Sequence, residues 1–469
     1  MILDDTIAAI ATPLGEGGLA VIRVSGPQAL GIADKCFSPA GTSAFRPSTA
    51  SSHTIHFGHI VRDASRTPSV GRRAKVIVDE VLLSVMRAPR TFTREDVVEI
   101  SCHGGMLPAR MVLDTLLENG ARLADPGEFT RRAFLNGRID LAQAEAVADL
   151  IHSRTELALR AANEQLAGKL SQRVNRSRED ILKTLAHIEA HIDFPDEDIA
   201  PDTKDQLISR LENAIASMDE LLRTADEGQI LRRGIRAVIV GRPNAGKSSL
   251  LNQLLGRDRA IVSPIPGTTR DTIEETANVR GLPVVFIDTA GLRAARDEIE
   301  LEGIRRSRQS LQQAELILNV LDASEPFTDE DSKYLGEMDG KKRIVVLNKT
   351  DLPARMVYPS ALNGLPAVRV CCITGQGIES LKDTIRNLVW SGEIKAEMLE
   401  VMINSRHQDA LNRARDATGR TLDALRRNET LDLVALDLRI AVNAIGEIVG
   451  NTTTEDLLDM IFSQFCIGK

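Results

Sequence analysis

The sequence has 469 residues, of which 43% are hydrophobic and 26% charged, a composition typical of globular proteins with more than one core. The net charge of −8 and the aromatic content of only 3% argue against a basic protein that stacks bases on aromatic rings. The five cysteines show no C-x-x-C spacing, which disfavours a disulfide framework or a zinc site and fits a reducing cytoplasm. No run of about 18 apolar residues predicts a membrane span, and the acidic start MILDDTIAAIATP is unlike a signal peptide.

Residues 1–136 mix strand and helix patterns. The runs TIAAIATP, LAVIRVSG, KVIVDEVLLSVM and DVVEISCHGG are strand-like, and MLPARMVLDTLLENG is typical of a helix that Gly120 closes. We therefore expect an α+β domain over residues 1–136.

Residues 137–233 are rich in Ala, Leu, Glu and Gln, with apolar residues recurring at intervals of three and four, which predicts long amphipathic helices. FPDEDIAPD interrupts this pattern, and a further helix is expected over roughly Asp205–Asp226. The pattern returns in residues 391–469, with helices expected over Arg406–Asn428, Leu431–Val449 and Thr454–Phe462. Both stretches can pack as one discontinuous helical domain.

Residues 234–390 alternate apolar strands with loops and helices. IRAVIV, VVFIDT, LILNVLD and RIVVLN are typical of strands buried in a parallel sheet. The fold class expected for the whole chain is therefore multidomain α/β, in which a doubly wound α/β domain is inserted into the helical domain.

The stretch GRPNAGKS matches G-x-x-x-x-G-K-[ST] between a strand and a helix, the context of a phosphate-binding loop. Lys247 would neutralise phosphate charge, and the Ser248 hydroxyl would bind Mg²⁺. DTAG follows a second strand, and there Asp288 would support the Mg²⁺ shell and the Gly291 N–H would meet the γ-phosphate. NKTD follows a third, and there Asp351 can accept the N1 and N2 protons of guanine. The three motifs in this order predict a GTPase.

Between the first two motifs, PGTTRD provides Thr268 or Thr269 as the switch threonine that senses γ-phosphate through Mg²⁺. Leu292 stands where Ras-type chains carry a water-orienting Gln, so Glu298 or Glu300 would take that role. CCITG provides Cys371 and Cys372 where a Ser-Ala pair is expected beside the base, which puts the serine-dependent contact in doubt. The GTP-binding residues expected are Asn244, Ala245, Gly246, Lys247, Ser248, Ser249, Thr268, Thr269, Asp288, Thr289, Ala290, Gly291, Asn348, Lys349, Asp351, Cys371 and Cys372.

Over nearly its full length the chain resembles the MnmE (TrmE) family of bacterial tRNA-modification GTPases. The resemblance rests on DTIAAIATPLGEGGLAVIRVSG, FTREDVVEISCHGG, PGEFTRRAFLNGRIDLAQAEAVADLI, IDFPDEDI, GRPNAGKSSLLN, PGTTRD, DTAGLR, NKTD and the terminal FCIGK. It implies a folate-binding and dimerising domain over residues 1–136, a helical domain over 137–233 and 391–469, and a Ras-like G domain over 234–390. It further implies a homodimer that acts with the FAD-containing partner MnmG (GidA), in a heterotetramer-type complex, on the wobble uridine of tRNA.

The resemblance also implies particular site residues. A tetrahydrofolate derivative (5-formyl- or 5,10-methylene-) would supply one carbon, bound by Arg23, Glu99, Arg138 and Lys469, although the family often has Lys where Arg138 stands. K⁺ would bind Asn244, with further oxygens from Ser263, Ile265 and Thr268, and Mg²⁺ would bind Ser248 and Thr269. Glu300 would position the attacking water. GTP hydrolysis would drive conformational change, not the group transfer itself.

The tail FSQFCIGK places a cysteine four residues from the end, as a prenylation motif does. Gly468 and Lys469 do not fit that motif, so we expect LLDMIFSQF to pack as a helix and to bring Cys466 to the folate site. Whether Cys466 acts as a nucleophile or only packs stays open. The main alternative function is a GTPase switch, such as a ribosome-assembly factor, without one-carbon chemistry. A scaffold that only dimerises and recruits is a third.

Overall fold

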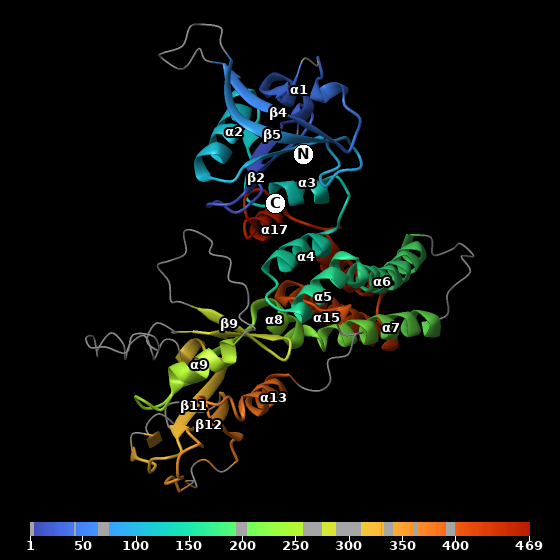
Figure 1. Ribbon diagram of the computed structural model, residues 1–469. Helices are drawn as coiled ribbons and strands as arrows, with labels where there is room; N and C mark the ends of the chain where they lie inside the picture. The colour runs from blue at the N-terminus through green and yellow to red at the C-terminus, as the bar shows by residue number, and fades with distance from the viewer. Residues whose placement is uncertain are drawn as a thin grey trace. The chain divides into compact units, whose positions relative to one another are not determined.

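The computed structural model describes residues 4–41, 44–63, 75–193, 204–256, 274–287, 311–329, 331–332, 341–357, 359, 362, 364–390 and 399–469. The chain divides into two compact units. In Figure 1 the colour follows residue number, from blue at the N-terminus to red at the C-terminus. The first unit comprises residues 1–145 and 449–469, and the second comprises residues 146–448. Among the described residues, none of the helices has the length and apolar character needed to span a bilayer.

The first unit is built on a seven-stranded sheet in the order β3-β4-β5-β6-β2-β1-β7, antiparallel except between β1 and β7. The elements are β1 (Ile7–Ile10), β2 (Leu19–Ser25), α1 (Ala29–Cys36), β3 (Phe37–Pro39), the 3₁₀ turn η1 (Pro47–Thr49), β4 (Thr54–Asp63), β5 (Lys75–Met86), β6 (Val97–His103), α2 (Met106–Glu118), β7 (Arg122–Leu123), α3 (Glu128–Leu135) and α17 (Glu455–Phe462).

Side chains alternate across this sheet as the two-residue period of a strand requires. In β2, Ile22 and Val24 are buried in a core that includes residues of α1 and α2, and Figure 1 shows those helices beside the sheet. Arg23 lies between them in sequence and therefore points to the opposite face. Its partner in the antiparallel register with β6 is Glu99. The sheet thus brings together two predicted site residues that are 76 positions apart in sequence.

The C-terminal segment completes the first unit, because α17 packs against α3. Two glycines with positive φ mark close approaches. A Cβ on Gly127 (φ +68°) would lie 2.6 Å from the Phe462 carbonyl oxygen, and a Cβ on Gly468 (φ +97°) would lie 2.5 Å from the Ile10 carbonyl oxygen. Only glycine fits at either position without displacing backbone. The tail is therefore held against α3 and the end of β1.

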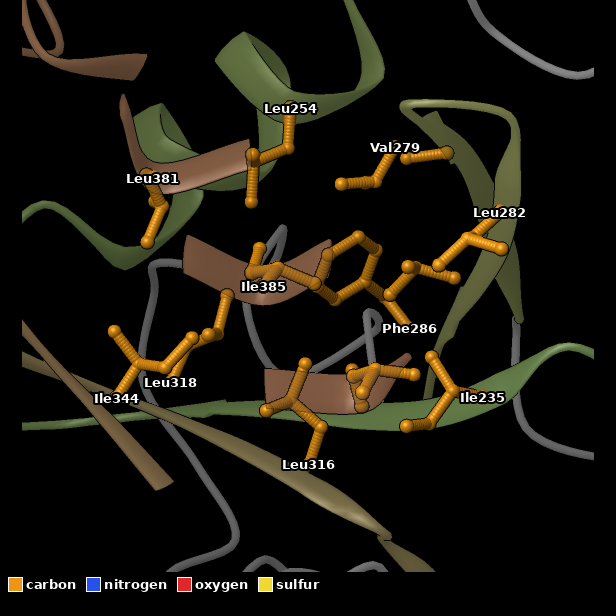
Figure 2. Close-up of a cluster of buried hydrophobic side chains, with 14 of the residues drawn as sticks. Ile235, Leu254, Val279, Leu282, Phe286, Leu316, Leu318, Ile344, Leu381 and Ile385 are labelled. Atoms are coloured by element: carbon orange, nitrogen blue, oxygen red, sulfur yellow. The ribbon is translucent and has the colours of Figure 1, made fainter. Parts of the chain in front are cut away.

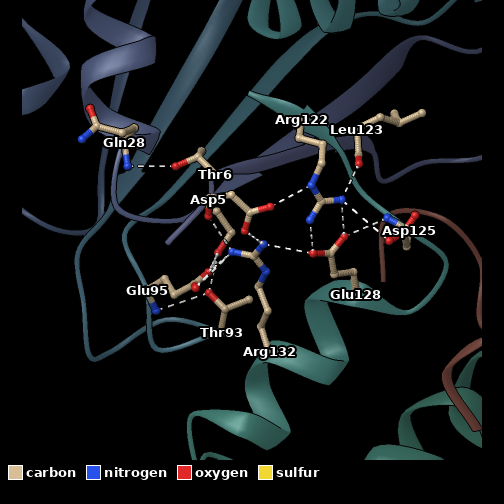
Figure 3. Close-up of polar contacts among 11 residues, drawn as sticks. Asp5, Thr6, Gln28, Thr93, Glu95, Arg122, Leu123, Asp125, Glu128 and Arg132 are labelled. Atoms are coloured by element: carbon tan, nitrogen blue, oxygen red, sulfur yellow. Dashed lines mark hydrogen bonds and ion pairs between the residues drawn. The ribbon is translucent and has the colours of Figure 1, made fainter. Parts of the chain in front are cut away.

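An ionic network around the buried Arg132 joins α3 to the segment before β1, to the loop before β6 and to β7 (Figure 3). The Arg132 side chain is 0% exposed and pairs with Asp5 at 2.6 Å, Glu128 at 3.0 Å and Glu95 at 3.2 Å. Arg122 supplies a second cation, 2.6 Å from Glu128 and 2.7 Å from Asp5. Burial acts to raise the pKa of both Asp5 and Glu128, but hydrogen bonds from the two arginines outweigh it and lower both pKa values.

The second unit contains a helical layer and a six-stranded sheet. Its elements are α4 (Leu141–His152, which begins in the first unit), α5 (Glu156–Leu166), α6 (Lys169–Asp193), α7 (Lys204–Leu222), α8 (Ala225–Arg233), β8 (Ile235–Val240), α9 (Lys247–Leu255), β9 (Glu275–Val279), β10 (Leu282–Phe286), β11 (Leu316–Asp322), β12 (Lys342–Asn348), β13 (Ala367–Arg369), α13 (Ile378–Val389), α15 (Ser405–Arg426) and α16 (Leu431–Val449).

Helices from the two sides of the sheet region meet in one layer. The helix α7, before the sheet, packs on both α6 and α15, and α15 follows the sheet in sequence. The predicted helix over Asp205–Asp226 is wrong at its end, because α7 stops at Leu222 and a separate helix, α8, begins at Ala225. The chain enters the sheet region directly from α8.

The six strands run in the order β13-β12-β11-β8-β10-β9, all parallel except for the antiparallel pair β9–β10. The core on one face of this sheet includes Leu254 of α9 and Leu381 and Ile385 of α13, which converge on Phe286 and Leu318 (Figure 2). Parallel strands buried on both faces read as continuous apolar runs, which is why β8, β11 and β12 were predictable. Their carboxyl ends position the site described next.

Candidate functional site

The phosphate-binding loop connects β8 to α9 and depends on two glycines with positive φ. A Cβ on Gly241 (φ +148°) would lie 2.2 Å from the Val320 carbonyl oxygen of β11. A Cβ on Gly246 (φ +98°) would lie 2.1 Å from Nδ2 of Asn348, at the end of β12. Three strand ends therefore enclose the loop so closely that side chains are excluded at these two positions. The backbone N–H groups that point out of the start of α9, together with the helix dipole, make this end of the helix suited to anions.

Lys247 begins α9, and its ammonium group lies within the loop. Its Nζ donates to the carbonyl oxygens of Gly241, at 2.8 Å, and Arg242, at 2.7 Å. Arg242 is itself fixed by an ion pair with the buried Asp331 at 2.7 Å. The cation is thus held where it can neutralise phosphate charge in the loop.

Asn348 links the phosphate loop to the predicted base-binding loop. It is 2% exposed, its Nδ2 donates to the Ala245 carbonyl at 2.9 Å, and its Oδ1 accepts from the Cys372 N–H at 3.2 Å. The side-chain amide of Gln253, on α9, donates to the Cys372 carbonyl at 2.7 Å. These contacts fix the geometry between a phosphate end and a base end of the site.

Asp351 is contacted by a thiol in place of the hydroxyl expected there. The Cys371 Sγ donates to Asp351 Oδ1 at 3.2 Å, and Cys371 itself is held by its N–H bond to the Gln376 carbonyl at 2.9 Å. A side-chain contact to Asp351 therefore survives the replacement of Ser by Cys. The Cys372 thiol is buried. Burial raises its pKa to about 11, so this thiol stays protonated.

These residues surround a cavity of about 550 Å³. It is lined by Pro243, Asn244, Gly246, Lys247, Ser248, Ser249, Asn348, Lys349, Asp351, Cys372 and Ile373. The Lys349 ammonium group forms an ion pair with Asp322, with Nζ 2.6 Å from Oδ2. Burial acts to raise the pKa of Asp322, but the Lys349 and Ser324 hydrogen bonds lower it overall, so this carboxylate stays ionised and anchors the lysine.

The remaining predicted nucleotide, metal and catalytic residues lie outside the described residues. They are Ser263, Ile265, Thr268, Thr269, Asp288, Thr289, Ala290, Gly291 and Glu300, together with Leu292 and Glu298. Their roles stay predictions. The described geometry covers the phosphate loop and the base-binding end.

A second candidate site lies in the first unit, around Arg23. The Arg23 Nε donates to Glu99 Oε1 at 2.8 Å. The guanidinium carbon also lies 5.6 Å from the ring centroid of Phe129 and 5.9 Å from that of Phe92, within range of a cation–π contact. Phe92 in turn lies 4.8 Å from the guanidinium carbon of Arg138. One aromatic ring, that of Phe92, thus contacts both predicted arginines.

Cationic side chains are concentrated in this cluster, where Arg23 and Lys469 lie close to the carboxylate of Glu99. Burial and the charge of Arg23 lower the pKa of the half-buried Lys469, while Glu99 and Cys466 act in the opposite direction. Burial and neighbouring Arg94 lower the pKa of Arg138. Lowered pKa values on cations mean that an added anion would be stabilised there.

Cys466 lies three residues before Lys469 and is exposed. Its carbonyl accepts the Gly127 N–H at 3.4 Å, which ties the tail to the start of α3. Thus all four predicted folate residues belong to one unit, and Arg23, Glu99 and Lys469 interact electrostatically. Phe92 and Phe129 were not predicted as site residues, although Phe92 stands as an aromatic residue within the polar stretch PRTFTRED.

Comparison with known proteins gives matches along the whole chain. The model of the MnmE helical domain matches residues 141–466, and that of the GTP-binding protein TrmE N-terminus matches residues 6–138. The tRNA modification GTPase MnmE of Geobacillus kaustophilus (strain HTA426) is 49% identical over 470 residues, covering 99% of each chain. The protein of that name from Bacillus subtilis (strain 168) is 47% identical and covers 99% of this chain and 100% of its own.

A third relative, the tRNA modification GTPase MnmE of Chloroflexus aurantiacus (strain ATCC 29366 / DSM 635 / J-10-fl), is 48% identical and covers 100% of both chains. Among solved structures, the G domain of the T. maritima FeoB iron transporter is 26% identical, with a TM-score of 0.25. It covers 33% of this chain and 98% of that one.

Proposed function

Because the chain belongs to the MnmE family of tRNA modification GTPases, we propose a specific chemistry for it, in which GTP hydrolysis serves modification of the tRNA wobble uridine. The chain is a GTP hydrolase of tRNA modification. In the proposal, an aminomethyl- or carboxymethylaminomethyl-type group is installed at C5 of the uridine, with a tetrahydrofolate one-carbon unit and an FAD-dependent partner. The observation that carries this proposal is the cluster in which Arg23 interacts with Glu99 and Lys469, while both Arg23 and Arg138 contact Phe92.

Guanine selection is assigned to Asp351. Its carboxylate can accept the N1 and N2 protons of guanine, and adenine lacks that pair of donors. The Cys371 thiol holds the carboxylate from one side, and Asn348 fixes the loop relative to the phosphates. Residues of the phosphate loop and of the base-binding end both line the cavity, which supports GTP as the ligand.

Mg²⁺ and K⁺ fit the oxygen donors of this site, since hard cations prefer oxygen ligands. The Ser248 hydroxyl, in the first turn of α9, would hold Mg²⁺ together with Thr269. Asn244 is exposed in the phosphate loop with φ +59° and would offer its amide oxygen to K⁺, with Ser263, Ile265 and Thr268 completing the shell. K⁺ would supply positive charge beside the transferring phosphoryl group, as an arginine finger does elsewhere.

The cation and the water-positioning residue have separate tests. If K⁺ is used, GTP turnover is faster in KCl than in NaCl, and equal turnover removes this role.

Glu300→Ala should greatly reduce turnover while GTP binding is kept. Unchanged turnover would transfer the role to another residue, with Glu298→Ala as the matched comparison.

The cluster around Arg23 has the chemistry that a reduced folate requires. The pterin edge carries donors that the Glu99 carboxylate can accept, and Phe92 offers an aromatic face. The glutamate tail of the folate carries two carboxylates, which the positive charges of Arg138 and Lys469 would neutralise. Each part of the ligand therefore has a complementary group in the cluster.

Calorimetry with 5-formyl-tetrahydrofolate tests this assignment on the full chain, because Lys469 lies far from Arg23 in sequence. We expect binding by the unchanged protein and at least tenfold weaker binding by Arg23→Ala, about 1.4 kcal/mol. Arg131→Ala is the matched control, since that side chain pairs with Asp459 instead. Absence of binding at millimolar ligand would leave the GTPase switch without one-carbon chemistry as the function.

Cys466 is proposed to take part in the chemistry, since its exposure leaves the packing alternative without support. Cys466→Ser should abolish wobble-uridine modification while folate binding and GTP turnover persist. Intact modification in this variant would leave the thiol without a chemical role.

A homodimer through the first unit is supported by an apolar stretch on the open face of its sheet. Phe57 and Leu82 are direct cross-strand neighbours on β4 and β5, and they are 51% and 45% exposed, with Ile55 at 67% on the same strand face. A second copy would bury these side chains. Phe57→Asp should lower the molar mass measured by light scattering from that of a dimer to that of a monomer.

The family supports three further proposals. They are MnmG as the FAD-carrying partner, a heterotetramer-type complex and a cytoplasmic location.

A further inference from the structure

Two histidines at the end of α6 face each other, and neither belongs to a candidate site described above. His187 and His191 are one helical turn apart, and their Nε2 atoms lie 3.1 Å from one another. Both side chains are half-buried, and the ring centroids are 4.7 Å apart with the planes at 70°. Within the described residues, each Nε2 has only the other as its hydrogen-bonding partner. The helix therefore presents two converging imidazole nitrogens.

The separation of the two nitrogens matches that of neighbouring ligands on one metal ion. Imidazole nitrogens lie about 2.0–2.1 Å from Zn²⁺, so two ligands are about 3.3 Å apart at a tetrahedral angle and about 2.9 Å apart at a right angle. The observed 3.1 Å lies between these values. Histidines at i and i+4 on one helix face are also the spacing that binds zinc in H-E-x-x-H helices.

The surroundings favour a cation at this place. The helix α6 ends at Asp193, two residues after His191, so the pair lies at the negative end of the helix dipole. Lys183, one turn earlier, is 4.0 Å from Glu179, which offsets its charge. Among the described residues no third His, Cys, Asp or Glu joins the pair, which leaves the other coordination positions to water.

We propose that His187 and His191 form a site for one borderline divalent transition-metal ion of the Zn²⁺, Ni²⁺ or Cu²⁺ class. Imidazole suits these ions, whereas Mg²⁺ and K⁺ prefer oxygen ligands, so the site is distinct in chemistry from the cation sites of GTP hydrolysis. The ion would take the place of the hydrogen bond between the two Nε2 atoms and would fix the last turn of α6.

Calorimetric titration of the untagged full-length protein with Ni²⁺ tests the site. The Cys466→Ser protein is used as the parent, because an exposed thiol competes for the ion. We expect one Ni²⁺ per chain in the parent, and at least tenfold weaker binding after His187→Ala or His191→Ala. The control His53→Ala removes a histidine that bonds only Ser52 among the described side chains, and it should bind Ni²⁺ as the parent does.

A second measurement separates this site from adventitious binding elsewhere. Trp390 is the single tryptophan and belongs to the second unit, so its fluorescence reports unfolding of the unit that contains α6. Saturating Ni²⁺ should raise that unfolding midpoint in the parent and not in the two histidine variants, since only an ion bound to the folded site stabilises it. GTP turnover in all variants should stay at the parent's rate. No Ni²⁺ binding by the parent at about 1 mM, or equal binding by His187→Ala, would show that the pair is only an N–H···N hydrogen bond.

Discussion

Replacing Arg132 by Met should destabilise the first unit strongly, because this buried cation pairs with three carboxylates. Removing one partner of a buried ion pair costs about 3–5 kcal/mol. The lower end applies here, since each carboxylate keeps another donor: Arg122 for Asp5 and Glu128, and the Ser25 hydroxyl for Glu95, at 2.6 Å. For a unit of this size each kcal/mol lowers the unfolding midpoint by roughly 2–4 °C. The expected decrease is therefore roughly 6–12 °C.

Differential scanning calorimetry on the full chain measures this change. The fluorescence of Trp390, in the second unit, should keep its midpoint while the calorimetric transition of the first unit moves down. Arg131→Met is the matched control, because Arg131 pairs at 2.7 Å with Asp459, which is 63% exposed, and such pairs contribute less than about 1 kcal/mol. A midpoint for Arg132→Met within about 2 °C of the unchanged protein would refute the reasoning.

Three further outcomes are expected. Gly246→Ala should weaken GTP binding at least about 100-fold in a fluorescent-nucleotide titration, or about 2.7 kcal/mol, whereas Gly364→Ala, which has positive φ but open space, should not. Gly468→Ala should weaken 5-formyl-tetrahydrofolate binding about tenfold with unchanged GTP turnover, and Gly120→Ala, with positive φ and open space in the same unit, should bind normally. The two carboxylates of the Arg132 network with lowered pKa values stabilise the fold fully above about pH 5, so the first unit's unfolding midpoint should fall as the pH drops from about 5 to 3. Arg132→Met should lose less over that range, and an equal loss in both proteins would contradict the assignment.

The meeting of the phosphate loop with the base-binding loop was predictable because it follows from strand ends. In a parallel sheet the carboxyl ends lie at one edge, so motifs after β8 and β12 had to meet, and Asn348 does contact Ala245. The Cys371 contact was not predictable, since a thiol can donate to a carboxylate or pack with apolar groups, and only the tertiary position decides. The switch residues stay predictions.

Elements that depend on tertiary contact were missed. The helix α8 contains Gly228, which lowers helix propensity by about 1 kcal/mol, and the polar sequence around it shows no clear apolar stripe. In the fold, a Cβ at Gly228 would lie 2.4 Å from the Ile403 carbonyl oxygen, so close packing requires the glycine that weakens the local signal. Likewise, a sequence cannot show that Arg132 is 0% exposed, because arginine is mostly found at surfaces.

The return of residues 449–469 to the first unit has a consequence for the order in which the protein matures. The ribosome makes residues 1–145, then about 300 residues of the second unit, and only afterwards the segment that packs on α3. At roughly 5–20 residues per second this interval is about 15–60 s. During that time the N-terminal part has a sheet but neither its last helix nor Lys469. The second unit can finish folding first, and the cluster around Arg23 is assembled only when the C-terminal segment leaves the ribosome. The two units therefore become complete in the reverse of the order in which their first residues are synthesised.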